Sequence, residues 1–150
     1  EGAEKIVEPS AKETNTDFSG KGERILFVDD EEQIRAVAAM LFSEHGYQVA
    51  TCQNGVQALE EFQNNPDKFD LVITDMTMPH MTGVELVQKI MGIRPDTPII
   101  LCSGQGEVIN RERALAMGVC AYLNKPVSQH DFLFAVRKAL ESRKPQHSQS

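Results

Sequence analysis

Five short apolar runs, each followed by a segment with helical spacing, constrain this chain more than any other feature. Because the runs are almost continuously apolar, they suit strands that are covered on both faces, as in a parallel sheet. Strands alternating with helices predict an α/β fold with right-handed crossovers. The predicted strands are Ile25–Asp29, Tyr47–Thr51, Leu71–Thr74, Ile99–Cys102 and Val119–Leu123.

The segments between the first four runs carry helix signals. Apolar residues at helical spacing over Ile34–Leu41 predict a helix that stops near Gly46. Val56–Phe62 predicts a second, shorter helix. Thr82, with Glu85 three residues later, forms a capping box at the start of a third helix.

The last two helices are predicted with different strength. Glu107–Met117 has the weakest helical pattern, because polar residues crowd its centre. Ser128 and Asp131 are expected to cap a final helix. Its apolar face comprises Phe132, Ala135, Val136, Ala139 and Leu140.

The two ends of the chain differ in composition from the part between them. Residues 1–22 are rich in Glu, Lys, Thr, Ser and Gly and show no sustained apolar period, which predicts a flexible linker. Residues 23–142 read as one domain, and residues 143–150 as a polar tail. The chain lacks an initiator Met, which suits an excised piece of a longer protein.

Charge and cysteine content exclude several function classes. The net charge is −7, which argues against a nucleic-acid or membrane-surface binder. The apolar runs fall far short of the roughly 20 residues that span a bilayer. Cys52, Cys102 and Cys120 are scattered among apolar neighbours, so we expect buried thiols in a reducing, cytoplasmic setting.

Polar and charged residues gather where the predicted strands end. In an open parallel sheet, ligands bind beyond the carboxyl ends of the strands, where strand order reverses. We therefore expect function to reside in the residues at these ends, which are Asp29, Asp30, Asp75, Ser103, Gly104, Asn124, Lys125 and Pro126.

The chemistry of this group favours phosphoryl transfer. Three clustered carboxylates repel one another unless a cation joins them, and Mg²⁺ binds carboxylates together with water and phosphate oxygens. Lys125 adds positive charge, Ser103 a hydroxyl donor, and Gly104 an unobstructed backbone amide. These groups position and neutralise a phosphoryl group, and aspartate is a known phosphoryl acceptor.

Each residue also has a simpler interpretation. Asp30 alone is better explained as a helix N-cap, and Asp75 as part of an Asx turn. Ser103 alone is an ordinary loop hydroxyl, and Lys125 a solvated surface charge. Their joint placement at four strand ends is much harder to obtain by accident.

The sequence resembles the receiver domains of bacterial response regulators and hybrid sensor kinases. The resemblance covers about Glu23–Leu140, through the strings ILFVDDEE, DLVITDMTMPHMTG, PIILCSG and AYLNKP. It implies a flavodoxin-like (βα)5 doubly wound sheet of order 2-1-3-4-5. It also implies a domain that catalyses its own phosphorylation and dephosphorylation without being a stand-alone enzyme.

The resemblance assigns a phosphoacceptor and a metal site. Asp75 corresponds to the phosphoacceptor. Asp30 corresponds to a direct ligand of Mg²⁺ or Mn²⁺, and Asp29 to an acid that acts through metal-bound water. Thr77 stands where the family supplies a backbone carbonyl to the metal.

The resemblance also assigns residues around the phosphoryl group. Lys125 corresponds to the lysine that pairs with it, and the bond to Pro126 is commonly cis in the family. From the chemistry of the strand ends, rather than from the resemblance, Gly104 is expected to offer its backbone amide to the phosphoryl group. Ser103 occupies the switch hydroxyl position, and Tyr122 the aromatic switch position, where a half-buried aromatic with a wet hydroxyl is an equally good interpretation.

Two alternatives lie outside this family. A flavodoxin shares the architecture, but its first loop must cradle a phosphate, which the acidic DDEE string would repel. A phosphatase of the haloacid-dehalogenase type also places an aspartate nucleophile after an apolar strand. It usually has a second acid two residues later, where this chain has Thr77.

The resemblance names classes of partner. We expect a histidine kinase or histidine phosphotransfer domain as phosphoryl donor. We also expect a dimer through the face formed by the Glu107–Met117 helix, the Val119–Leu123 strand and the final helix. No DNA-binding region is recognised after Leu140, and the leader ending in GKGERILFVDDE favours a hybrid histidine kinase over a free-standing regulator.

Overall fold

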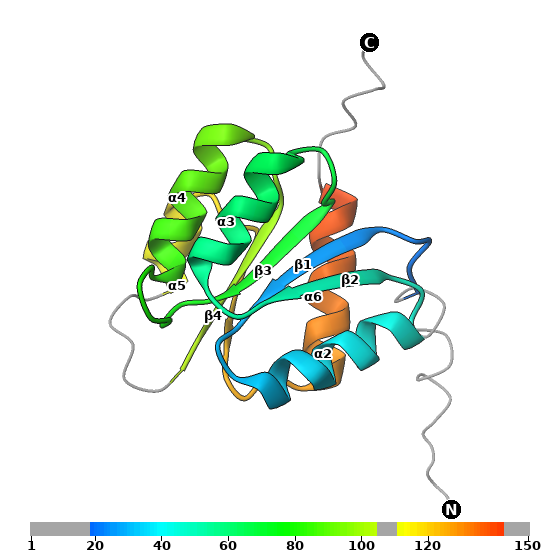
Figure 1. Ribbon diagram of the computed structural model, residues 1–150. Coiled ribbons are helices and arrows are strands. Elements are labelled where there is room, and N and C mark those ends of the chain that lie inside the picture. Colours follow the sequence, from blue (N-terminus) through cyan, green and yellow to red (C-terminus); the bar gives the residue numbers. More distant parts are fainter. Residues whose placement is uncertain (1–18, 105–110, 143–150) are drawn as a thin grey trace, which may run out of the picture.

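A single parallel sheet organises the chain. The computed structural model describes residues 19–104 and 111–142. Its five strands are all parallel and lie in the order β2-β1-β3-β4-β5 (Figure 1). The predicted fold class and strand order are therefore confirmed. The strands are β1 Arg24–Val28, β2 Gln48–Cys52, β3 Leu71–Asp75, β4 Ile99–Ser103 and β5 Ala121–Asn124.

Helices cover both faces of the sheet. They are α2 Glu32–Glu44, α3 Gly55–Asn64, α4 Gly83–Ile93, α5 Arg111–Ala116 and α6 Gln129–Ser142. Figure 1 shows α2 and α6 on one face and α3, α4 and α5 on the other. Within the described residues, no helix combines the length and apolar character needed to cross a membrane.

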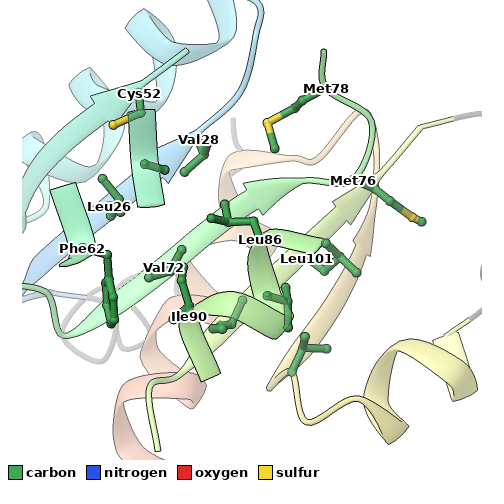
Figure 2. Close-up of a cluster of buried hydrophobic side chains, with 14 of the residues drawn as sticks. Leu26, Val28, Cys52, Phe62, Val72, Met76, Met78, Leu86, Ile90 and Leu101 are labelled. Atoms are coloured by element: carbon green, nitrogen blue, oxygen red, sulfur yellow. The ribbon is translucent and has the colours of Figure 1, made fainter. Parts of the chain in front are cut away.

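Alternation along each strand divides the core into two halves. Leu26 and Val28 of β1 join the cluster under α3 and α4, whereas Ile25 and Phe27 join the cluster under α2 and α6. This follows from the two-residue period of a strand, which sends successive side chains to opposite faces. Figure 2 shows the first cluster, in which Leu86 of α4 lies over the sheet. Burial on both faces explains the continuous apolar runs.

Capping groups place the helix starts. The predicted capping box is present, because Thr82 Oγ1 accepts from the Glu85 amide at 3.1 Å and Glu85 Oε1 accepts from the Thr82 amide at 3.0 Å. Ser128 Oγ accepts from the Asp131 amide at 3.0 Å, as expected for a cap of α6. These bonds satisfy amides that lack a partner within the helix.

The start of α2 differs from expectation. Its N-cap is Glu31, which makes no side-chain capping bond. The interpretation of Asp30 as the N-cap is therefore wrong. Asp29 supplies the local bond instead, because its Oδ1 accepts from the Glu31 amide at 2.9 Å.

Three further expectations, on one helix, one strand and one cysteine, differ in part from the structure. The predicted Glu107–Met117 helix is observed as α5, Arg111–Ala116, and residues 107–110 lie outside the described part. β5 begins at Ala121, two residues later than predicted. Cys52 and Cys102 are buried, but Cys120 is exposed, so the expectation of a buried thiol is wrong there.

The ends of the chain are described only near the domain. Gly20 and Gly22 donate their amides to the carbonyl oxygens of His45 and Gly46 at 2.6 and 2.8 Å. Residues 19–22 thus lie against the turn between α2 and β2. The remainder of the predicted linker, residues 1–18, and the tail, residues 143–150, lie outside the described residues.

Candidate functional site

The strand order brings the predicted site residues to one edge. The chain runs from β1 outward to β2, then crosses back to β3 on the other side of β1. Asp29 follows β1 and Asp75 is the last residue of β3, so they lie on either side of this reversal. A parallel sheet leaves space for a ligand at such a point, because successive connections depart to opposite faces.

Three carboxylates meet at this edge. One oxygen each from Asp29, Asp30 and Asp75 lie within 4.8 Å of one another. Asp29 and Asp75 are only 2% and 6% exposed, whereas Asp30 faces solvent. The predicted acid cluster is thus brought together, with two acids in a largely dry environment.

Lys125 joins two of these acids. Its Nζ lies 3.1 Å from Asp29 Oδ2 and 3.3 Å from Asp75 Oδ1. The loop after β5 holds Lys125 in place, since its amide donates to the Ser103 carbonyl at 2.7 Å. The Lys125–Pro126 bond is cis, as the resemblance implied.

Charge crowding alters the acid–base properties of the site. Burial, and then the neighbouring Asp29 carboxylate, raise the pKa of Asp75 to about 6, although Lys125 opposes the shift. Burial disfavours the charged form of Lys125, but its contacts with Asp29 and Asp75 outweigh this and raise its pKa. The pair therefore contains a firmly charged ammonium and a carboxylate that is not fully compensated.

The other predicted residues surround the acids. Thr77, Gly104 and Lys125 line a cleft of about 760 Å³ together with Asp30 and Asp75. Ser103 is buried, and its hydroxyl donates to Asn124 Oδ1 at 3.1 Å. The Ser103 hydroxyl thus has a partner at the end of the neighbouring strand.

Tyr122 lies away from solvent. It is 5% exposed and belongs to the core cluster that also contains Ala114 of α5 and Leu101 of β4. The interpretation as a half-buried aromatic with a wet hydroxyl does not fit this burial. The ring is already inside the domain in this structure.

One residue with a structural role at the site, Arg35, and one contact, between Asn124 and Ser103, were not predicted. Arg35, the fourth residue of α2, donates from Nη1 to the carbonyl oxygen of Asp29 at 2.9 Å. Asn124 was noted as a strand-end residue, but its bond to Ser103 was not foreseen. The sequence shows a basic residue six positions after Asp29, but it does not show that the Arg35 side chain points back toward Asp29.

The donor set fits a hard divalent cation. Asp29, Asp30 and Asp75 offer carboxylate oxygens, and Thr77 lines the cleft next to them on the loop that follows β3. Mg²⁺ and Mn²⁺ favour such oxygen ligands. A cation would also favour the charged carboxylate of Asp75, whose pKa is raised first by burial and then by the Asp29 carboxylate.

Comparison with known families agrees with this geometry. The family model described as the response regulator receiver domain matches residues 25–137, which contain every residue of the site. The chain belongs to this receiver family. The two-component classification implied by the resemblance is therefore confirmed.

This receiver domain is similar to parts of longer regulators. It is 32% identical over 128 residues to the transcriptional regulatory protein GlrR of Escherichia coli strain K12, covering 85% of this chain and 28% of that protein. It is 37% identical over 106 residues to the two-component response regulator ORR24 of Oryza sativa subsp. indica, covering 71% and 17%. The chain therefore spans less than a third of these relatives.

Solved receiver structures have the same fold. A response regulator receiver domain protein from Clostridium thermocellum matches with a TM-score of 0.76 and 33% identity, covering 79% of this chain and 94% of that one. A CheY-like receiver domain protein from Methanospirillum hungatei JF-1 matches with a TM-score of 0.75 and 29% identity, covering 86% and 99%.

Proposed function

We propose that this receiver domain accepts a phosphoryl group from phosphohistidine onto Asp75, with Mg²⁺ or Mn²⁺ as cofactor. The observation that carries the proposal is the meeting of three carboxylates and Lys125 at the reversal of strand order. This arrangement has a nucleophile, a fixed positive charge and oxygen ligands within one cleft.

The proposed transfer is a displacement at phosphorus. A carboxylate oxygen of Asp75 forms a bond to phosphorus, the phosphorus–nitrogen bond of phosphohistidine breaks, and the imidazole nitrogen keeps the electron pair. Lys125 lies 3.3 Å from Asp75 and offsets negative charge on the phosphoryl oxygens. Asp29, Asp30, Asp75 and the Thr77 carbonyl would hold the divalent ion, which when bound supplies further charge neutralisation.

A conformational response is proposed to start at Ser103. Its hydroxyl donates to Asn124, so reaching a phosphoryl group on Asp75 requires exchange of that partner. The next described element after Ser103 along the chain is α5, in which Ala114 is the buried residue. Because Tyr122 is already buried, its inward turn is not required as a first event.

Phosphate uptake from acetyl phosphate tests the proposal. Intact masses would be compared for the wild type, Asp75→Asn and Asp75→Ala, with Mg²⁺ and with a chelator. We expect one added phosphoryl group in the wild type with Mg²⁺ and none in the other samples. Undiminished uptake in both variants would overturn the assignment of Asp75.

The parent protein and its partners are also proposals. The relatives compared above are named as a transcriptional regulatory protein and a response regulator, which supports a regulator parent more than a hybrid histidine kinase. A histidine kinase or histidine phosphotransfer domain is the proposed phosphoryl source, and the cytoplasm the proposed location.

We propose the face of α5, β5 and α6 as the site of dimer formation. Phe134 on α6 is 48% exposed, and Leu115 on α5 is 41% exposed. Sedimentation of the beryllofluoride-treated domain tests this proposal. A monomer at every concentration would contradict it.

A further inference from the structure

The start of α4 lies directly against the backbone of Asp75. Gly83 is the first residue of α4 and is buried, and its amide donates to the Met76 carbonyl at 2.8 Å. A methyl group at Gly83 would fall well inside contact distance of the Asp75 carbonyl oxygen. It would also lie 2.8 Å from the Met76 Cα. Both are backbone atoms, so no flexible side chain is available to move aside.

The peptide group that Gly83 touches also orients the Asp75 carboxylate. Its carbonyl oxygen belongs to Asp75 and accepts from Thr74 Oγ1 at 3.0 Å. Its amide belongs to Met76 and donates to Asp75 Oδ1 at 3.0 Å and to the Cys102 carbonyl at 2.8 Å. A displacement of this peptide therefore changes the direction of the carboxylate that it holds.

The helix has little freedom to retreat from this contact. Leu86 and Ile90 of α4 are both fully buried against the sheet, in the cluster that Figure 2 shows. A shift of α4 that made room for a side chain would open a gap in this cluster, and closely packed interiors resist such gaps. The peptide of Asp75 is then the part that must give way.

We propose that Gly83 is a positioning residue for Asp75. The absence of a side chain lets α4 lie against the Asp75–Met76 peptide, and this contact sets the orientation of the carboxylate and the course of the loop through Thr77. The expected effect of Gly83 on the rate of phosphate uptake rests on the proposed role of Asp75 as phosphoacceptor. The expected effect on the orientation of the Asp75 carboxylate does not.

Gly92 provides a matched control on the same helix. It is exposed, and a methyl group there meets nothing within 4 Å. Alanine has a higher helix propensity than glycine, so propensity alone predicts no loss at either position. The difference between Gly83→Ala and Gly92→Ala therefore isolates the contact with Asp75.

The experiment compares Gly83→Ala, Gly92→Ala and Ile90→Val, the last as a variant that weakens the packing of α4 without touching the peptide. Initial rates of phosphate uptake would be measured over a range of acetyl phosphate concentrations at saturating Mg²⁺. Amide spectra without metal would follow the Met76 signal. In Gly83→Ala we expect a maximal rate lower by roughly tenfold or more, because small misplacements of a reacting group have large kinetic effects.

The expected pattern is specific to Gly83. Substitution of Gly83 should move the Met76 signal. It should also lower the maximal rate by a larger factor than it changes the acetyl phosphate concentration at half-saturation. The two controls should stay within about twofold of the wild type, because neither substitution adds an atom against the Asp75–Met76 peptide. An unmoved Met76 signal with an unchanged rate in Gly83→Ala overturns the proposal, as does an equal loss of rate in Ile90→Val.

Two other outcomes are also decisive. If Gly83→Ala does not fold, the test is repeated in the Gly92→Ala background, where the helix is stabilised. A chain that is still unfolded there overturns the proposal, because Gly83 would then be a requirement for folding. If the wild type takes up no phosphate, the proposed function fails, while the Met76 signal still decides the geometric role of Gly83.

Discussion

The ammonium nitrogen of Lys125 lies 3.3 Å from Oδ1 of Asp75. This contact favours the charged carboxylate, but burial and the Asp29 carboxylate disfavour it, and the net effect raises the pKa of Asp75 to about 6. One lysine therefore does not compensate the cluster. Without metal, burial and the Asp29 carboxylate together disfavour the charged form of Asp75. This has consequences for stability, for metal binding and for reactivity.

The first prediction concerns stability without metal. The folded-state pKa of Asp75 lies above its ordinary value of 3.8, so the folded domain binds the proton more tightly than the unfolded chain. This group's contribution is therefore most favourable below about pH 4 and is lost as the pH rises through about 6. Asp75→Asn lacks this titration, and at pH 8 we expect it to be more stable than the wild type by on the order of 1–3 kcal/mol.

Urea denaturation in the presence of a chelator measures this difference. The stability advantage of Asp75→Asn should shrink between pH 8 and pH 4.5. Asp96→Asn is the matched control, because Asp96 is exposed and lies outside the acid cluster. A constant difference between Asp75→Asn and the wild type across this range contradicts the prediction.

The second prediction concerns metal binding. Mg²⁺ should raise the melting temperature, because the three carboxylates are brought together only in the folded domain. At a free concentration a hundred times Kd, the linkage is worth about 2.7 kcal/mol. Asp30→Ala should abolish most of the shift, because Asp30 is proposed as a direct ligand, and Asp29→Ala should reduce it less.

Titration calorimetry provides the direct comparison. Glu32→Ala serves as control, because Glu32 is an exposed acid in the first turn of α2 but is not part of the cluster. Equal Mg²⁺ affinity in the wild type and Asp30→Ala would refute the ligand role of Asp30.

The third prediction concerns Lys125. Its ammonium lowers the pKa of Asp75, so Lys125→Met should raise that pKa further above about 6. It should also slow phosphate uptake, because a fixed charge beside the phosphoryl group is lost. The carboxyl carbon shift of Asp75, followed against pH without metal, reports the pKa. Lys89→Met is the control, since Lys89 is exposed on α4. An unchanged pKa of Asp75 in Lys125→Met would argue against the prediction.

Much of the fold and site could be predicted from the sequence, because burial of a strand on both faces produces a simple sequence pattern. Strands covered on both faces must be apolar throughout, so their ends are visible where acids and hydroxyls begin. The positions of Asp29, Asp75 and Ser103 at strand ends could therefore be predicted. Parallel pairing then places those ends at one edge, whatever the details of the loops.

The errors arose where a contact depends on the residue at which a helix begins, or on how closely two elements pack. Asp30 has the residue type of an N-cap, but the helix begins at Glu32 with Glu31 as N-cap. The contact of Gly83 with the Asp75 carbonyl depends on how closely α4 packs. Propensity and periodicity describe neighbours along the chain, and do not specify distances between elements.

The last prediction concerns the response to phosphorylation. In the present structure the Ser103 hydroxyl donates to Asn124 at 3.1 Å. Beryllofluoride on Asp75 stands in for the phosphoryl group and should draw this hydroxyl away from Asn124. Amide shift changes should then spread from Asp75 to α5 and Tyr122, because Tyr122 packs in the cluster that contains Leu101 of β4 and Ala114 of α5. The physical requirement is two states only a few kcal/mol apart, one of which the ligand prefers.

Substitutions at Ser103 separate this switch from simple binding. Ser103→Ala should bind beryllofluoride but show reduced spreading, whereas Ser103→Thr retains the hydroxyl and should spread changes as the wild type does. Shift changes confined to the strand ends in the wild type would mean that the domain accepts a phosphoryl group without this switch, as a relay or sink would. Equal spreading in Ser103→Ala and the wild type would instead place the trigger elsewhere in the loop, because the hydroxyl is then dispensable.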